Sequence, residues 1–114
     1  MNSTGSFLCA RGDAKEIIVR KTGVTINIAS VSGMIGKDRC VYEDTDMLAV
    51  TIDCSAVKGA VINMTRDLAC HLAPHNIRVN AIIMTGFERG QPQKFLDRYR
   101  KAFPWEGSRR MAKT

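Results

Sequence analysis

Hydrophobic positions along the chain follow two spacings, one typical of helices and one typical of strands. Between residues 5 and 20 the apolar side chains fall near one face of a helix, and Gly23 is well placed to end it. Residues 24–29 are β-branched and mostly apolar, which predicts a short strand buried on both faces. Residues 30–33 then open a loop.

The strongest helical pattern covers residues 55–73. Its apolar side chains follow the i, i+3, i+4, i+7 rule, and Pro74 is expected to end the helix because proline cannot continue it. Residues 77–83 are again strongly apolar and predict a second strand. The helix thus stands between the two predicted strands.

Two stretches lie outside this strand–helix–strand pattern. Residues 36–53 are polar and acidic and predict a surface excursion, long enough to be functional or mobile. Residues 91–101 predict a last helix with Phe95 and Leu96 as its apolar contacts, and the sequence through residues 105–107 is expected to be irregular.

Strands separated by a helix of this length imply parallel crossover connections. The order therefore predicts an α/β fold, a partial doubly wound (Rossmann-type) parallel sheet. Parallel strands need strand neighbours on both sides and helices on both faces, and each βαβ unit takes roughly 30 or more residues. We expect a sheet that is truncated at both ends, its missing strands coming from further sequence or from another chain.

Charge is distributed unevenly along the chain. Residues 1–88 carry nine basic and nine acidic residues, whereas residues 89–114 carry eight basic and two acidic ones and so supply the whole net charge of +6. We interpret the latter as a basic C-terminal segment that includes the short helix. A basic tail can bind nucleic acid, but this one lacks the interleaved aromatics of a strand-binding groove, so no nucleic-acid partner is expected.

Four cysteines, at positions 9, 40, 54 and 70, include no Cys-x-x-Cys pair. Their spacing argues against a zinc site or a disulfide framework, so we expect no metal and reduced thiols in a cytoplasmic protein. No apolar stretch approaches the ~20 residues that span a bilayer, and the first residues do not have the pattern of a signal peptide. We therefore expect no membrane partner.

Four short motifs occur in the order in which one known family has them. They are Asn2-Ser3-Thr4-Gly5, Ile26-Asn27-Ile28-Ala29-Ser30, Lys58-Gly59-Ala60-Val61 and Ile77-Arg78-Val79-Asn80-Ala81-Ile82. With these motifs, which cover nearly the whole chain, the sequence resembles the catalytic C-terminal half of short-chain dehydrogenases/reductases. The resemblance implies an oxidoreductase that acts on an alcohol or carbonyl with NAD or NADP, with residues 1–88 as the partial catalytic region.

The resemblance also implies roles for single residues. In the family a tyrosine exchanges a proton with the substrate oxygen, and a lysine one helical turn later lowers the pKa of the tyrosine and holds the nicotinamide ribose. A serine orients the substrate oxygen, an asparagine completes a proton relay, and the cofactor carries the hydride. Lys58, Ser30 and Asn2 match the lysine, the serine and the asparagine, whereas Cys54 stands at the tyrosine position. Thr85-Gly86-Phe87 matches the segment that closes around the nicotinamide, so these three residues and Lys58 are the expected cofactor-binding residues.

Several features depart from the family pattern. Proton transfer needs a heavy-atom separation of about 2.6–3.2 Å. Because a cysteine side chain is much shorter than that of tyrosine, we expect Cys54 to fall short of this separation. None of the nine glycines forms the family's Gly-x-x-x-Gly-x-Gly phosphate loop. The interval of 24 positions from Ser30 to Cys54 is longer than usual for the family. In that long interval, and in Gly86-Phe87 and Gln91-Pro92, the sequence resembles some sugar-acid dehydrogenases.

Two hypotheses follow from these departures. In the first, the chain is a truncated and impaired NAD(P)-dependent oxidoreductase whose substrate is sugar-acid-like. In the second, it is a catalytically inactive remnant that serves as a self-association or interaction module. The resemblance implies a homo-oligomer in which helices 5–20 and 55–73 build the subunit interface, as they commonly do in this family.

Overall fold

The computed structural model describes residues 2–102, with side chains from Ser3 onward. The described residues divide into two compact units, one formed by residues 2–35 and 52–84 and the other by residues 36–51 and 85–102. The division at residue 88 that the charge distribution indicates stays a prediction. Within residues 2–102, no helix is both long and apolar enough to cross a membrane.

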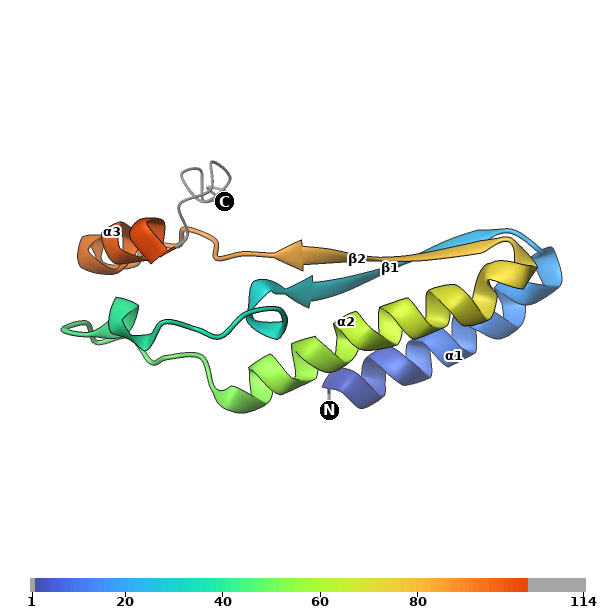
Figure 1. Ribbon diagram of the computed structural model, residues 1–114, viewed down its shortest axis with the longest axis horizontal. Coiled ribbons are helices and arrows are strands. Elements are labelled where there is room, and N and C mark those ends of the chain that lie inside the picture. Colours follow the sequence, from blue (N-terminus) through green and yellow to red (C-terminus); the bar gives the residue numbers. More distant parts are fainter. Residues whose placement is uncertain (1, 103–114) are drawn as a thin grey trace. The chain divides into compact units, whose positions relative to one another are not determined.

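The first unit is a two-stranded parallel sheet with two long helices (Figure 1). Its strands pair in register from Gly23 opposite Ile77 to Ser30 opposite Met84, so the carboxyl ends of both strands lie next to each other. The parallel α/β arrangement predicted from the sequence is therefore confirmed. In chain order the elements are α1 (Asn2–Arg20), β1 (Gly23–Ser30), the 3-10 helix η1 (Val31–Gly33), α2 (Ile52–Leu72), the 3-10 helix η3 (Ala73–His75) and β2 (Ile77–Met84).

Helix α1 ends at Arg20, and the prediction that Gly23 ends it is wrong. Lys21 turns the chain instead, with a left-handed φ of 52°. Gly23 is the first residue of β1 and lies against α1, since a Cβ atom there would be 2.2 Å from Cγ2 of Ile17. The glycine is needed for close packing of helix on strand, and not for a helix cap.

Helix α2 begins three residues before the predicted start and ends at Leu72. Pro74 lies in η3, directly after the α-helix, as expected of a residue that cannot continue one. Asn76 then takes a left-handed conformation, with φ of 57°, and leads the chain into β2. Asparagine tolerates this conformation better than most residues, which fits its place between the helix and the strand.

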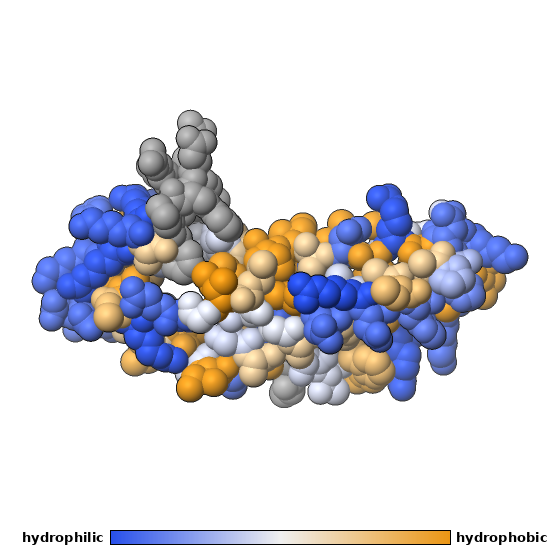
Figure 2. Space-filling view, in the orientation of Figure 1, coloured by the Kyte–Doolittle hydropathy of each residue, from blue (hydrophilic) through white to orange (hydrophobic). Residues whose placement is uncertain are grey.

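Both helices cover the same side of the sheet, and this arrangement explains the burial of the strands (Figure 1). One core cluster joins Ala29 to Val61 and Ile62, and a second joins Leu72 to Ile77 and Val79. The opposite face is open, so the prediction of a strand buried on both faces is wrong for β1. Four apolar side chains on that face, Val24, Ile26, Ile28 and Ile82, are 49–55% exposed, and Figure 2 shows apolar surface over the strands.

One polar contact lies within the covered side of the sheet. The side-chain amide of Asn27 donates a hydrogen bond to Oγ1 of Thr65 at 2.9 Å, and the Thr65 hydroxyl donates to the carbonyl of Val61 at 2.8 Å. Thr65 is buried, so these bonds satisfy a hydroxyl that would otherwise destabilise the core. They also tie the middle of β1 to α2.

The second unit contains the 3-10 helix η2 (Arg39–Tyr42) and the helix α3 (Gln93–Ala102). Val41, Phe95 and Leu96 are buried together, with Tyr42, Met47 and Tyr99 packed against them. The expected apolar contacts of the last helix, Phe95 and Leu96, are confirmed. The polar stretch 36–53 is more ordered than expected, because its Val41 belongs to this small core. The expected irregular residues 105–107 lie outside the described residues.

Candidate active site

Ser30 is the last residue of β1, and its hydroxyl is oriented by its neighbour Ser32. The backbone N–H of Ser32 donates to Oγ of Ser30 at 3.3 Å, and the Ser32 hydroxyl donates to the same oxygen at 3.0 Å. A serine hydroxyl has two acceptor positions and one proton. Ser32 occupies both acceptor positions of this hydroxyl, so the Ser30 proton remains available as a hydrogen-bond donor.

Ser32 was not singled out in the sequence, although it is buried, with 5% exposure. The Ser-x-Ser spacing at the end of a strand is the signal that could have identified it. Ser30 caps η1 from an extended conformation, and its Oγ accepts from the residue two positions later, which is a local interaction that the spacing predicts.

Lys58 lies on α2, and its ammonium group reaches the end of β1. Nζ donates to the carbonyl oxygen of Ile28 at 2.8 Å, two residues before Ser30. An ammonium group has three donors, so two remain for other oxygens such as the hydroxyls of a ribose. The structure thus brings the predicted lysine to the strand that carries the predicted serine.

A close backbone contact fixes this arrangement. A Cβ atom on Gly33 would lie 2.5 Å from both the backbone nitrogen of Gly59 and the carbonyl carbon of Lys58. Only glycine therefore allows η1 to lie directly against α2 at the position of Lys58. This contact links residues 26 positions apart, and the local sequence pattern does not indicate it.

Cys54 lies in the first turn of α2, one helical turn before Lys58, as the predicted spacing requires. Its thiol is free and partly buried. Asn2 is the first residue of α1, and its side chain lies outside the described part of the structure. Ser30, Cys54 and Lys58 all belong to the first unit.

The other predicted cofactor-binding residues, Thr85, Gly86 and Phe87, follow β2 and belong to the second unit, where all three are partly buried. The backbone N–H of Gly86 donates to the Tyr99 hydroxyl at 3.1 Å. The carbonyl of Phe87 accepts from the side-chain amide of Gln91 at 2.6 Å. Side chains from the same unit therefore hold this segment at two successive residues.

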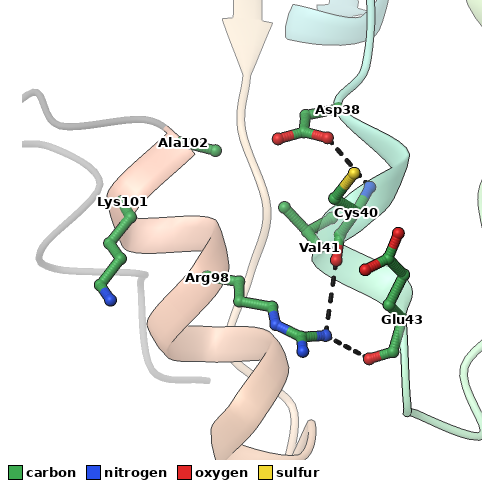
Figure 3. A pocket seen from close by; sticks show the side chains of 7 residues that line it. All are labelled: Asp38, Cys40, Val41, Glu43, Arg98, Lys101 and Ala102. Atoms are coloured by element: carbon green, nitrogen blue, oxygen red, sulfur yellow. Dashed lines mark hydrogen bonds between the residues drawn. The ribbon is translucent and has the colours of Figure 1, made fainter.

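The second unit also contains a pocket of about 380 Å³ between η2 and α3 (Figure 3). Its polar lining includes Asp38, Cys40, Glu43, Arg98 and Lys101. A hydrogen bond to the Asp38 carboxylate raises the pKa of the Cys40 thiol above its ordinary value, and one to Glu43 adds to the effect. Among residues 2–102, no three His, Cys, Asp or Glu side chains are grouped so that they could hold a metal ion.

Several curated relatives are about one third identical to this chain. A 3-oxoacyl-[acyl-carrier-protein] reductase from Synechocystis is 35% identical over 82 residues, and a 5-keto-D-gluconate 5-reductase from Escherichia coli is 34% identical over 82 residues. An inactive 2-(S)-hydroxypropyl-CoM dehydrogenase from Xanthobacter autotrophicus is 30% identical over the same length. Each match covers 72% of this chain but only 28–31% of the relative.

Two solved structures that contain NAD+ share the fold. A short chain dehydrogenase from Leptospira borgpetersenii has a TM-score of 0.73 and 26% identity, and the match covers 86% of this chain and 37% of that one. A xylitol dehydrogenase has a TM-score of 0.66 and 28% identity over 87% of this chain and 33% of its own. The short chain dehydrogenase family matches residues 1–97, which include all the candidate site residues. The chain therefore belongs to the short chain dehydrogenase family.

Proposed function

We propose that this chain carries the catalytic part of an NAD(P)-dependent oxidoreductase that acts on a small alcohol or carbonyl substrate. One observation carries the proposal. Ser32 orients the Ser30 hydroxyl at the end of β1, and Lys58 contacts the same end of that strand. In this proposal Ser30 donates a hydrogen bond to the substrate oxygen, and Lys58 holds the nicotinamide ribose with its two remaining donors.

The proton-transfer step is where we expect impairment. Lys58 stands one turn after Cys54, so a proton donor at position 54 would lie beside an ammonium group. A thiol at that position is too short to occupy the place of a tyrosine hydroxyl, and general acid–base catalysis contributes roughly 10²–10⁴-fold. Asn2 completes the proton relay in this proposal. We therefore propose that the site binds its substrate oxygen but transfers the proton slowly.

The cofactor, when bound, accepts or supplies the hydride. We propose that Lys58, in the first unit, would hold the nicotinamide ribose, because its ammonium group has two further donors. In the second unit, the Thr85–Phe87 segment is proposed as cofactor-binding, and its backbone is held by side chains at two residues. No Gly-rich phosphate loop occurs in the sequence, so we propose that residues outside it hold the pyrophosphate. The two NAD+-bound neighbours support the cofactor class without deciding between NAD and NADP.

For the substrate we propose a polyol, a keto sugar or a related sugar acid. The relatives include a 5-keto-D-gluconate 5-reductase, and the solved neighbours include a xylitol dehydrogenase. The long interval between Ser30 and Cys54 and the Gly86-Phe87 and Gln91-Pro92 pairs point in the same direction. The four free cysteines agree with the cytoplasm as the proposed location.

A chimera tests the proposed cofactor site. Residues 1–102 replace the equivalent segment of the E. coli 5-keto-D-gluconate 5-reductase, which supplies the rest of its domain, and NADH and NADPH are titrated by fluorescence. We expect saturable binding of one cofactor, and a Lys58→Met change should weaken it at least about tenfold by removing charge-assisted hydrogen bonds. Lys15→Met, on the exposed part of α1, is the matched control. Absence of binding, or equal effects of both changes, would contradict the proposal.

Self-association is the second candidate function, and a groove between α1 and α2 favours it. Ser3, Thr4, Phe7, Ala60, Val61 and Met64 line a cavity of about 390 Å³, and Phe7 is 49% exposed. Apolar surface of this kind is typical of interaction sites. We propose that a second copy of the chain covers it, which would give a homo-oligomer even if the catalytic site were inactive.

Sedimentation velocity of the purified chain tests this candidate. We expect a concentration-dependent dimer that Phe7→Glu converts to monomer, because a carboxylate would be buried without a partner. Val19→Glu is the matched control, since Val19 lies on the same helix and is 81% exposed. A monomer at every concentration, or equal loss of dimer in both variants, would refute self-association through this groove.

A further inference from the structure

Adjacent residues of α3 hold two separate segments of the second unit. The Arg98 guanidinium donates to the backbone carbonyls of Cys40 (3.4 Å) and Glu43 (Figure 3). It also pairs with the carboxylate of Asp44 at 3.2 Å. The next residue, Tyr99, accepts a hydrogen bond from the backbone N–H of Gly86 at 3.1 Å. Helix α3 thus connects the insertion, residues 36–51, to the segment that follows β2.

Aromatic packing holds the Tyr99 side chain in place, in addition to the hydrogen bond with Gly86. Its ring lies 5.6 Å from the ring of Phe95, one helical turn earlier, and Phe95 lies 5.2 Å from Tyr42 of the insertion. Phe95 is 5% exposed, so this row of rings is anchored in the core of the unit. A hydroxyl on such a ring has little rotational freedom to lose, which makes its hydrogen bond effective in fixing a backbone position.

The Tyr99 hydroxyl accepts its hydrogen bond from Gly86, the residue of the Thr85–Phe87 segment that has no side chain. A glycine gains no packing from a side chain, so its backbone is fixed only by its own hydrogen bonds and by its neighbours. On the next residue, the Phe87 carbonyl is held by Gln91 at 2.6 Å. The N–H of Gly86 and the carbonyl of Phe87 are therefore both supported by side chains that follow them in the chain.

We infer that Tyr99 is a positioning residue, whose hydroxyl fixes the Gly86 backbone and through it the Thr85–Phe87 segment. The inference rests on the proposed function for its catalytic meaning, since this segment is the one expected to close around the nicotinamide. Its structural content is independent of that function. Neither Tyr99 nor the aromatic row was indicated by the family motifs.

Amide hydrogen exchange of the full chain, resolved by NMR, tests the inference directly. The Gly86 amide of the unmodified chain should exchange more slowly than a freely exposed amide. The substitution Tyr99→Phe keeps the ring and removes the hydroxyl, and it should speed exchange at Gly86 roughly fivefold, as expected for the loss of one hydrogen bond. Tyr42→Phe removes a hydroxyl from the same row of rings and should leave Gly86 unchanged.

Three outcomes overturn the inference: an unprotected Gly86 amide in the unmodified chain, unchanged exchange in Tyr99→Phe, or an equal effect of Tyr42→Phe. The first is decisive even if a variant fails to fold. In the chimera described above, Tyr99→Phe should also raise the dissociation constant for NADH several-fold, while Tyr42→Phe should not. A chimera that binds no cofactor would refute the proposed function but would leave the amide-exchange result to decide the role of Tyr99.

Discussion

The contact between η1 and α2 predicts that a small substitution, Gly33→Ala, destabilises the fold. The added Cβ atom would lie 2.5 Å from the backbone nitrogen of Gly59 and from the carbonyl carbon of Lys58. Carbon atoms pack best at about 3.5–4.0 Å, so the methyl group is about 1 Å too close. Both neighbours are backbone atoms and cannot rotate away. The loop must therefore move away from the helix.

The expected change in the free energy of unfolding is a balance of two effects. Overpacking costs typically about 1–3 kcal/mol, and the backbone contact places this site near the upper end of that range. Replacing glycine also restricts the unfolded chain, which stabilises the folded state by about 0.4–1 kcal/mol. We therefore expect Gly33→Ala to lower the free energy of unfolding by about 2–2.5 kcal/mol.

Gly59→Ala is the matched control, because it adds the same methyl group on the other side of the same contact. Its Cβ atom would lie 3.5 Å from the Gly33 carbonyl oxygen, which is ordinary van der Waals contact. Gly59 is inside α2, where alanine is favoured over glycine by up to about 1 kcal/mol. The two substitutions should thus change stability in opposite directions.

Urea unfolding followed by far-UV circular dichroism measures both changes. We expect a lower urea midpoint for Gly33→Ala and an equal or higher midpoint for Gly59→Ala. A Gly33→Ala chain as stable as the original would show that η1 does not lie against α2 in solution. This contact could then not hold Ser30 and Lys58 near each other.

Three further changes test other parts of the structure. Thr65→Val removes the acceptor for Asn27 and should cost about 1–2 kcal/mol in urea unfolding, whereas Thr65→Ser should cost less because it keeps the hydroxyl. Asp38→Asn removes the carboxylate that raises the pKa of Cys40, so at a fixed neutral pH the thiolate fraction and the rate of alkylation by iodoacetamide should rise, and an unchanged rate would contradict the assigned cause. Ile26→Lys, on the open sheet face, should change stability by less than about 0.5 kcal/mol, and a loss above 2 kcal/mol would show that the face is covered.

The regular elements could be predicted because their signals are local. The apolar periodicity of α2 and the β-branched runs of β1 and β2 placed these elements within three residues of their observed bounds. Burial of the open face could not be predicted in the same way. Whether Ile26 and Ile28 are covered depends on which elements pack on the sheet, and both long helices lie on the other side.

The candidate site could be predicted only in part, because the motifs identify residues but not the contacts that orient them. Ser30 and Lys58 could be identified from the order of motifs, but the contacts that orient them are made by Ser32 and by Gly33. The first is a buried side chain two residues away, and the second is a backbone contact between distant parts of the chain. Val41 likewise stands in a polar stretch, and only its packing against α3 shows that it belongs to a core.

The rate of carbonyl reduction by the chimera shows most directly whether Cys54 limits catalysis, because it isolates the effect of position 54. The measurement compares 5-keto-D-gluconate reduction by the chimera with Cys54 and by its Cys54→Tyr variant, with Cys70→Tyr on the same helix as the control. We predict that Cys54→Tyr raises kcat by about 10²-fold or more, as expected when a general acid is restored, and that Cys70→Tyr leaves it unchanged. Equal rates with cysteine and tyrosine at position 54 would contradict the claim that this residue limits an otherwise intact site.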